Sequence, residues 1–153
     1  MDLSDLIAPE AIFPELKPKN KKQALQLVAQ RAAKLTGLEE RVILDTLLQR
    51  ERLGSTGIGR GIAIPHGRVP GLQRIVSLFA RLEEPIEFEA LDSDPVDLIF
   101  LLLAPEHAGA DHLKALARIS RLLRETDSIE RLRASRDRAT IYSVLTGPAV
   151  HAA

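Results

Sequence analysis

The 153-residue sequence contains no cysteine and no tryptophan, and aromatic residues make up only 3% of it. The absence of cysteine excludes disulfides, zinc fingers, iron–sulfur ligation and cysteine nucleophiles, and it fits a reducing compartment. The scarcity of aromatic rings argues against stacking platforms for single-stranded nucleic acid. Lys and Arg total 21 and Asp and Glu total 21, so the positive excess of a nucleic-acid binder is also missing. We therefore expect no nucleic-acid partner.

Long apolar runs are missing as well. No segment approaches the roughly 18 apolar residues of a membrane span, and the start over residues 1–5 lacks the basic residues of a signal peptide. These features predict a cytoplasmic protein without membrane insertion.

The composition that is present suits one globular domain. Hydrophobic residues make up 45% of the chain, and a domain of about this length buries roughly 68–70% of the surface its unfolded chain exposes. We expect one domain over residues 1–148, followed by a disordered tail over residues 149–153.

Five segments show helical capping signals or apolar residues at helical spacing. The first has Asn20 as its N-cap, with Gln23 three residues on, and stops at Gly37. The other four begin at about Glu39, with Gly54 as its terminator, and at Asp111, Asp127 and Asp137.

Three segments predict strands. Residues 62–64 are short and β-branched and end at Pro65, and residues 74–82 alternate, which indicates a strand with one better-buried face. Residues 96–103 are almost continuously apolar, as in a central strand covered on both faces. This order of elements predicts an α/β fold, a single-domain mixed β-sheet flanked by helices on both faces.

The densest group of unusual residues lies between Arg50 and Arg68. We expect His66 to be presented by a rigid loop, held by the fixed φ of Pro65 and left uncrowded by Gly67. Such an imidazole could act as a nucleophile with access from one side. The alternative is an ordinary exposed loop histidine.

Four arginines accompany this histidine, and guanidinium groups can hold the oxygens of a phosphoryl group. The alternative is that at least two of them form a solvated face. They are Arg50, Arg52, Arg60 and Arg68.

The glycine-rich stretch over residues 54–61 does not support a nucleotide site. Residues 57–61 read G-x-G-x-G and precede a strand, and no G-K-[S/T] follows. Ser55 lies outside a G-x-S-x-G elbow, so a serine hydrolase is not supported either.

The second candidate site histidine is His112, in the first turn of a predicted helix, where the helix dipole favours a neutral ring and attracts anions. His107 and His112 form a weak H-x4-H spacing, from which we expect no metal site. His107 and His151 are expected to be surface or tail residues, and nothing indicates a cofactor.

The stretch over residues 50–68, RERLGSTGIGRGIAIPHGR, closely resembles the signature of the enzyme IIA (EIIA) proteins of the fructose/mannitol/nitrogen branch of the bacterial phosphotransferase system. The resemblance extends to residues 85–86, 95–100 and 111–113 and so spans essentially the whole chain.

The resemblance implies a phosphohistidine relay, a phosphotransferase component rather than a free-standing small-molecule enzyme. His66 would accept a phosphoryl group from an HPr/NPr-type phosphocarrier and later give it up. Arg50 matches the arginine that stabilises the phosphoryl charge, and His112 matches the second histidine, which hydrogen-bonds the phosphoryl group.

Within the family, the opening residues 3–7 and the close match over residues 57–67, with no fused domain in the sequence, resemble the nitrogen-regulatory type. This implies downstream regulatory targets, such as potassium-transport components or sensor kinases, selected by phosphorylation state.

Two rival interpretations stay open. A fructose- or mannitol-type sugar EIIA would pass the phosphoryl group to a IIB domain, and a pure interaction module would bind partners without being phosphorylated. Ile58, Ile62 and Val69 are candidates for an apolar carrier-docking patch, with burial in the core as the alternative. The sequence does not indicate an oligomeric state.

Overall fold

The computed structural model describes residues 3–147. The expected tail over residues 149–153, with His151, lies outside the described residues, and the domain boundary at residue 148 stays a prediction. No helix in the described part of the chain is long and apolar enough to cross a membrane.

Helices and strands follow one another in the order that gives a mixed α/β fold. The strands are β1 (Ile12–Leu16), β2 (Gly57–Gly59), β3 (Ile62–Ala63), β4 (His66–Val69), β5 (Val76–Ile86) and β6 (Val96–Pro105). The helices are α1 (Lys21–Thr36), α2 (Glu40–Arg52), α3 (Ala110–Leu122), α4 (Thr126–Ala134) and α5 (Arg138–Thr146), with short 3-10 turns at Leu3–Asp5 and Pro9–Ala11.

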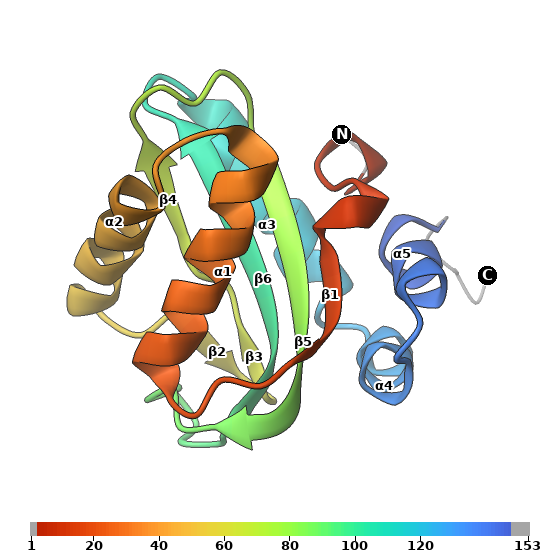
Figure 1. Ribbon diagram of the computed structural model, residues 1–153. Coiled ribbons are helices and arrows are strands. Elements are labelled where there is room, and N and C mark those ends of the chain that lie inside the picture. Colours follow the sequence, from red (N-terminus) through yellow and green to blue (C-terminus); the bar gives the residue numbers. More distant parts are fainter. Residues whose placement is uncertain (1–2, 148–153) are drawn as a thin grey trace.

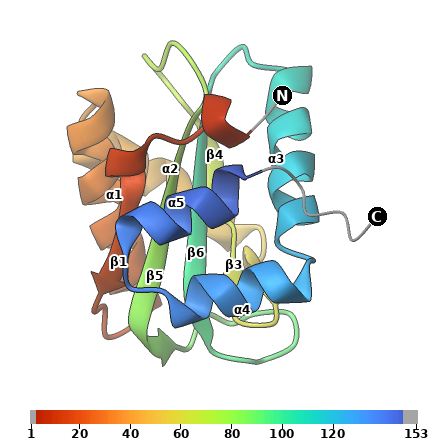
Figure 2. The same ribbon diagram turned by 90° about the vertical axis from the view of Figure 1, so that its right-hand side faces the viewer.

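The strands form one mixed sheet in the order β1-β5-β6-β3-β2, and β4 also pairs with β6. The β5/β6 pairing is antiparallel, whereas β1 is parallel to β5, and both β3 and β4 are parallel to β6. Helices α1 and α2 cover one face of the sheet, and α3, α4 and α5 cover the other (Figures 1 and 2). The predicted fold class is therefore confirmed.

Strand β6 is the centre of the hydrophobic core. Its residues from Leu98 to Pro105 are all buried, as the prediction of a strand covered on both faces requires. Strand β5 differs from its prediction. Ser77 and Phe79, which lie on the face expected to be less buried, are 1% and 0% exposed, because helices lie against both faces of the sheet.

Local capping explains where α1 and α5 begin. The side chain of Asn20 accepts a hydrogen bond from the backbone N–H of Gln23 at 2.8 Å, and Asp137 does the same for Thr140 at 2.9 Å. These two predicted starts are confirmed. Asp111 is not a cap, because Gly109 is the N-cap of α3 and Asp111 lies inside its first turn.

Strands β1 and β2, which were not predicted, lie at the two ends of the sheet order. Pro14 interrupts the pattern of β1, but an edge strand tolerates proline because one side of its backbone needs no partner. Strands β2 and β3 form a tight hairpin. Its two central residues, Arg60 and Gly61, have φ values of 61° and 81°, the positive values that such two-residue turns require.

The packing of α2 on β4 leaves no room for a side chain at Gly67. A β-carbon there would lie 2.5 Å from Cγ2 of Thr46 on α2. Glycine thus lets α2 approach the strand that begins with His66, which brings the end of the helix close to this histidine.

We expect Gly67→Ala to lower the free energy of unfolding by about 1–3 kcal/mol, because the added methyl group overpacks the contact with α2. Thr46→Ser removes the opposing methyl group and keeps the hydroxyl that bonds to the Val42 carbonyl. Urea unfolding of both single variants and the double variant should show that Thr46→Ser relieves most of the loss. If the losses of unfolding free energy in the two single variants simply add in the double variant, the contact between residues 46 and 67 is not the cause of the loss.

Candidate functional site

His66 is the first residue of β4, so the expectation that a loop presents it is wrong. Strand β4 is stabilised by parallel pairing with β6, in which His66 lies opposite Leu102, and the Pro65 carbonyl accepts a bond from the Leu102 N–H at 2.9 Å. Pro65 still lies at the break between β3 and β4. A short strand therefore fixes the backbone on which the half-buried imidazole is carried.

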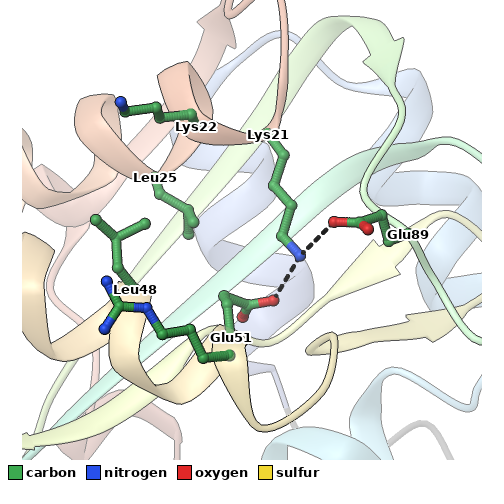
Figure 3. A pocket seen from close by; sticks show the side chains of 7 residues that line it. Lys21, Lys22, Leu25, Leu48, Glu51 and Glu89 are labelled. Atoms are coloured by element: carbon green, nitrogen blue, oxygen red, sulfur yellow. Dashed lines mark hydrogen bonds and ion pairs between the residues drawn. The ribbon is translucent and has the colours of Figure 1, made fainter.

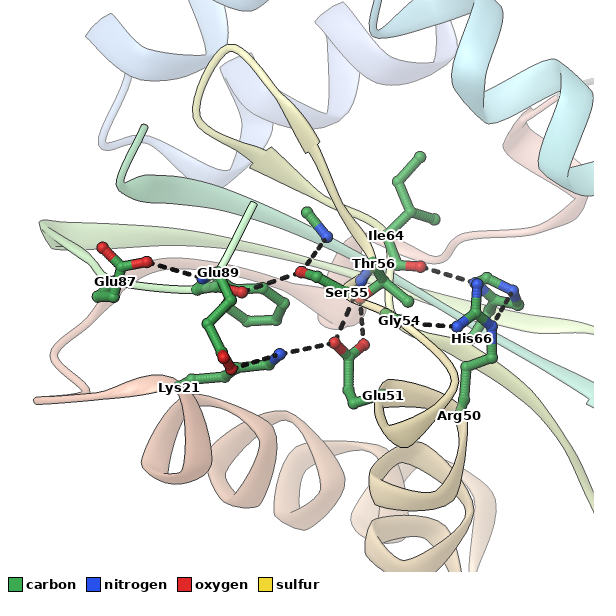
Figure 4. Close-up of polar contacts among 12 residues, drawn as sticks. Lys21, Arg50, Glu51, Gly54, Ser55, Thr56, Ile64, His66, Glu87 and Glu89 are labelled. Carbon is green, nitrogen blue, oxygen red and sulfur yellow. Dashed lines mark hydrogen bonds and ion pairs between the residues drawn. The ribbon is translucent and has the colours of Figure 1, made fainter. Parts of the chain in front are cut away.

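The hydrogen bonds of the His66 ring define its chemistry. Nδ1 lies 2.8 Å from the carbonyl oxygen of Ile64, which can only accept, so Nδ1 carries the proton of the neutral ring. The lone pair is then on Nε2, and it accepts a hydrogen bond from Nε of Arg50 at 3.3 Å (Figure 4). The neutral ring thus has one defined nucleophilic atom, Nε2.

Arg50 lies in the last turn of α2, where a cation interacts favourably with the helix dipole. Its Nη1 donates to the carbonyl oxygen of Gly54 at 3.0 Å, while its Nε contacts His66. The guanidinium group is therefore held by the loop that follows its own helix. This arrangement places a positive charge beside Nε2.

His112 lies in the first turn of α3, as predicted, and its ring centroid is 5.8 Å from that of His66, with the ring planes 65° apart. The residue is only 7% exposed, and among the described residues its Nε2 has no hydrogen-bond partner. Burial lowers the pKa of His112, and electrostatic interactions with His66 and Arg68 lower this pKa further. The ring is therefore neutral at pH 7, which leaves one N–H to donate.

The four arginines expected around the site lie in different places. Only Arg50 contacts His66, and Arg68 lies near enough to act on His112. Arg60 donates to the Arg124 carbonyl and to the Thr126 hydroxyl, so it ties the β2–β3 hairpin to the start of α4. Arg52 lines a separate pocket. Arg52 and Arg60 are both exposed, which fits the alternative that at least two of these arginines form a solvated face.

The three apolar residues considered for carrier docking differ in their burial. Ile62 and Val69 are 1% and 0% exposed, so they belong to the core and are wrong as docking residues, whereas Ile58 is 45% exposed. Two other leucines near the site are exposed and were not singled out from the sequence. Leu53 and Leu113 follow closely on Arg50 and His112 and are 84% and 65% exposed.

Sequence reasoning missed a polar cluster behind Arg50. Glu51, with its side chain 7% exposed, pairs with Lys21 at 2.9 Å and accepts a hydrogen bond from the Thr56 N–H at 3.1 Å. The pair borders a pocket of about 470 Å³, which Lys22, Leu25, Leu48, Arg52 and Glu89 also line (Figure 3). The one sequence signal was an acidic residue in the last turn of a helix, where the dipole disfavours it.

Within residues 3–147 no three His, Asp or Glu side chains are grouped so that they could hold a metal ion. His107 is exposed. The chemistry available to the site is that of two imidazoles and one guanidinium group, a nucleophile with a cation and an N–H donor beside it.

Two curated relatives illustrate what the sequence is similar to. It is 62% identical over 153 residues to a nitrogen regulatory protein of Bradyrhizobium diazoefficiens, an alignment that covers all of both chains. It is also 35% identical over 145 residues to a "PTS system fructose-specific EIIA component" of Haloferax volcanii, covering 94% of each chain.

Solved structures show the same fold. The nitrogen regulatory protein IIA-Ntr from Neisseria meningitidis superimposes with a TM-score of 0.89 at 31% identity, covering 94% of this chain and 99% of that one. The IIA mannitol enzyme of Escherichia coli, solved as a complex with phosphorylated IIB mannitol, gives a TM-score of 0.78 at 22% identity, covering 94% and 100%.

The family model described as "Phosphoenolpyruvate-dependent sugar phosphotransferase system, EIIA 2" matches residues 5–147, almost the whole chain. The geometry around His66, the relatives and the shared fold lead to the same assignment. This protein belongs to the EIIA type 2 family of the phosphoenolpyruvate-dependent phosphotransferase system.

Proposed function

We propose that this protein is a phosphoryl relay in nitrogen regulation, phosphorylated on Nε2 of His66 by an HPr/NPr-type phosphocarrier in the cytoplasm. The observation that carries the proposal is the 2.8 Å contact between Nδ1 of His66 and the Ile64 carbonyl. This contact leaves the lone pair of the neutral ring on Nε2, beside Arg50. Membership of the EIIA family supports the same chemistry.

In the transfer step, the lone pair of Nε2 attacks the phosphorus atom carried by the phosphocarrier. The new bond forms between Nε2 and phosphorus as the bond to the carrier breaks, and its electron pair leaves with the carrier. Arg50 must give up its hydrogen bond to Nε2 as this bond forms, and its guanidinium group then faces the phosphoryl oxygens. When the phosphoryl group is passed on to a downstream partner, the bond between Nε2 and phosphorus breaks and Arg50 can again donate to Nε2.

His112 supports the bound phosphoryl group in this scheme. Its neutral ring supplies one N–H, and the first turn of α3 places it where the helix dipole favours an anion. Its Nε2 is buried without a partner among the described residues, so with the proton on this atom the ring can donate to a phosphoryl oxygen.

The relatives favour the nitrogen branch, since the protein of Bradyrhizobium diazoefficiens matches over its full length. Downstream partners would then be regulatory targets, such as potassium-transport components or sensor kinases. The fructose-specific relative of Haloferax volcanii favours a second candidate, a sugar EIIA that passes the phosphoryl group to a IIB domain. Rapid phosphoryl transfer from the phosphorylated protein to such a domain would favour that candidate.

We expect one acid-labile phosphoryl group after incubation with phosphoenolpyruvate, enzyme I and HPr, or with their nitrogen-branch counterparts. Intact-mass measurement should find it on the wild type and on His107→Ala, which removes an exposed histidine outside the site. It should be absent from His66→Ala, because His66 is the imidazole within residues 3–147 whose lone pair accepts from Arg50. The faster carrier would identify the branch.

A His66→Ala protein that is phosphorylated as fully as the wild type would contradict the assignment of the acceptor. A folded wild type that neither carrier phosphorylates would instead support an interaction module on the same fold.

The lowered pKa of His112 predicts how stability depends on pH. In the unfolded chain this pKa is close to 6.5, and in the folded protein it lies below that value. Between the two values the unfolded chain binds more protons, so the free energy of unfolding rises with pH through this range. The contribution of neutral His112 to the free energy of unfolding is fully present above pH 6.5, and it is lost as the pH falls through the pKa of His112 in the folded protein.

Urea unfolding at a series of pH values, for the wild type and His112→Asn, measures this contribution. We expect the wild type to lose stability more steeply than the variant as the pH falls below 6.5. Parallel curves for the two proteins would show that the pKa of His112 is not lowered by folding.

A further inference from the structure

We propose that Glu51 is a positioning residue for phosphoryl transfer, which holds His66 and Arg50 in the arrangement that keeps Nε2 unprotonated and beside the guanidinium group. The proposal rests on the proposed function. The partners of Glu51 are Thr56 and Lys21 and not His66, so Glu51 acts through other residues. From its carboxylate, a chain of hydrogen bonds leads to Nδ1 of His66, and the loop over residues 53–56 leads to Arg50, which donates to Nε2 (Figure 4).

The first path runs through the backbone to the His66 ring. The carboxylate of Glu51 accepts from the backbone N–H of Thr56 at 3.1 Å and from its hydroxyl group. The Thr56 carbonyl then accepts from the N–H of Ile64 at 2.9 Å, and the Ile64 carbonyl accepts from Nδ1 of His66 at 2.8 Å. The carbonyl that selects the tautomer of His66 is therefore held in place through Thr56.

The second path runs through the end of α2. Gly54, which precedes Thr56 by two residues, accepts from Nη1 of Arg50 at 3.0 Å. Glu51 follows Arg50 directly, so adjacent side chains of the helix hold the loop over residues 53–56 at two points. A loop released at Thr56 would move its contact with Arg50 as well, and with it the guanidinium group beside Nε2.

The position of Glu51 is unfavourable for the helix itself. An acidic residue in the last turn is disfavoured by the helix dipole, and a carboxylate only 7% exposed also loses hydration. Lys21 at the start of α1 offsets these costs with an ion pair at 2.9 Å, and its Nζ also lies 4.8 Å from the centre of the Phe88 ring. Glu51 is thus kept at a position that is unfavourable for the helix, and from there it holds the segments that carry His66 and Arg50. This combination points to a role of Glu51 in positioning the site.

A matched control lies on the other side of Lys21. Glu89 is also paired with Lys21, at 3.4 Å (Figure 3), but its side chain is 78% exposed and it makes no hydrogen bond to Thr56. Glu89→Ala removes one carboxylate near Lys21 without releasing the loop, so it reproduces the change of charge but not the loss of positioning.

The first test compares phosphoryl transfer from the carrier to the full-length variants. For Glu51→Ala we expect the maximal rate of transfer to fall by about 10- to 100-fold with little change in the KM for the carrier, because the reacting groups are misplaced. Glu51→Gln, which keeps one oxygen acceptor and offers Thr56 Oγ1 an N–H, should recover most of the rate. Glu89→Ala should match the wild type.

The second test measures the protonation of the His66 ring nitrogens and needs no phosphoryl transfer. Nitrogen-15 NMR of the His66 ring should show one tautomer, with the proton on Nδ1, in the wild type and in Glu89→Ala. In Glu51→Ala we expect a mixture with the tautomer that carries the proton on Nε2. Because this readout needs no carrier, it tests the proposal even if the wild type is never phosphorylated.

Thr56→Val provides a second route if Glu51→Ala does not fold, since it removes the hydroxyl contact alone. It should show a smaller shift of the tautomer and a smaller loss of rate. The proposal is overturned if the folded variants keep a single Nδ1–H tautomer and the wild-type maximal rate while only their melting temperatures fall. It is also overturned if the loss appears only in the KM for the carrier.

Discussion

The hydrogen bond from Nδ1 of His66 to the carbonyl of Ile64 is the contact on which the site depends. It decides which ring nitrogen carries the proton, and therefore which atom can act as a nucleophile. The contact spans only two residues, across Pro65, but long-range pairing holds both of its ends. The Ile64 N–H donates to Thr56, and His66 lies opposite Leu102 on the central strand. The tautomer is thus a product of the fold.

The sheet brings together groups that are distant in the sequence. Arg50 comes from the end of α2 and His112 from the start of α3, so a positive charge and a helix N-terminus meet at one imidazole. The Arg50 guanidinium group and the N-terminus of α3 both suit an anion, and Nε2 of His112 has no partner among the described residues. A phosphoryl group on His66 would meet the donors that the resting site leaves unused.

The sequence predicted those features whose signals are local. The Asn20 and Asp137 caps mark the starts of two helices, the apolar run over residues 96–103 marks the central strand, and the motif around His66 marks the family. Features set by pairing across the sheet were missed. His66 is in a strand only because β6 lies beside it, and Pro14 and the glycines of β2 conceal two edge strands. For Ile62 and Val69 the sequence left both a docking patch and the core open, and the structure places both residues in the core.

The central claim is that Nε2 of His66 is the atom that accepts the phosphoryl group. The most direct measurement is nitrogen-15 and phosphorus-31 NMR of the ring-labelled phosphorylated protein, in which coupling to phosphorus identifies the bonded nitrogen. The account predicts phosphorus on Nε2, with Nδ1 still protonated and hydrogen-bonded. Phosphorus on Nδ1 would contradict it, because that atom could react only after its bond to the Ile64 carbonyl had broken.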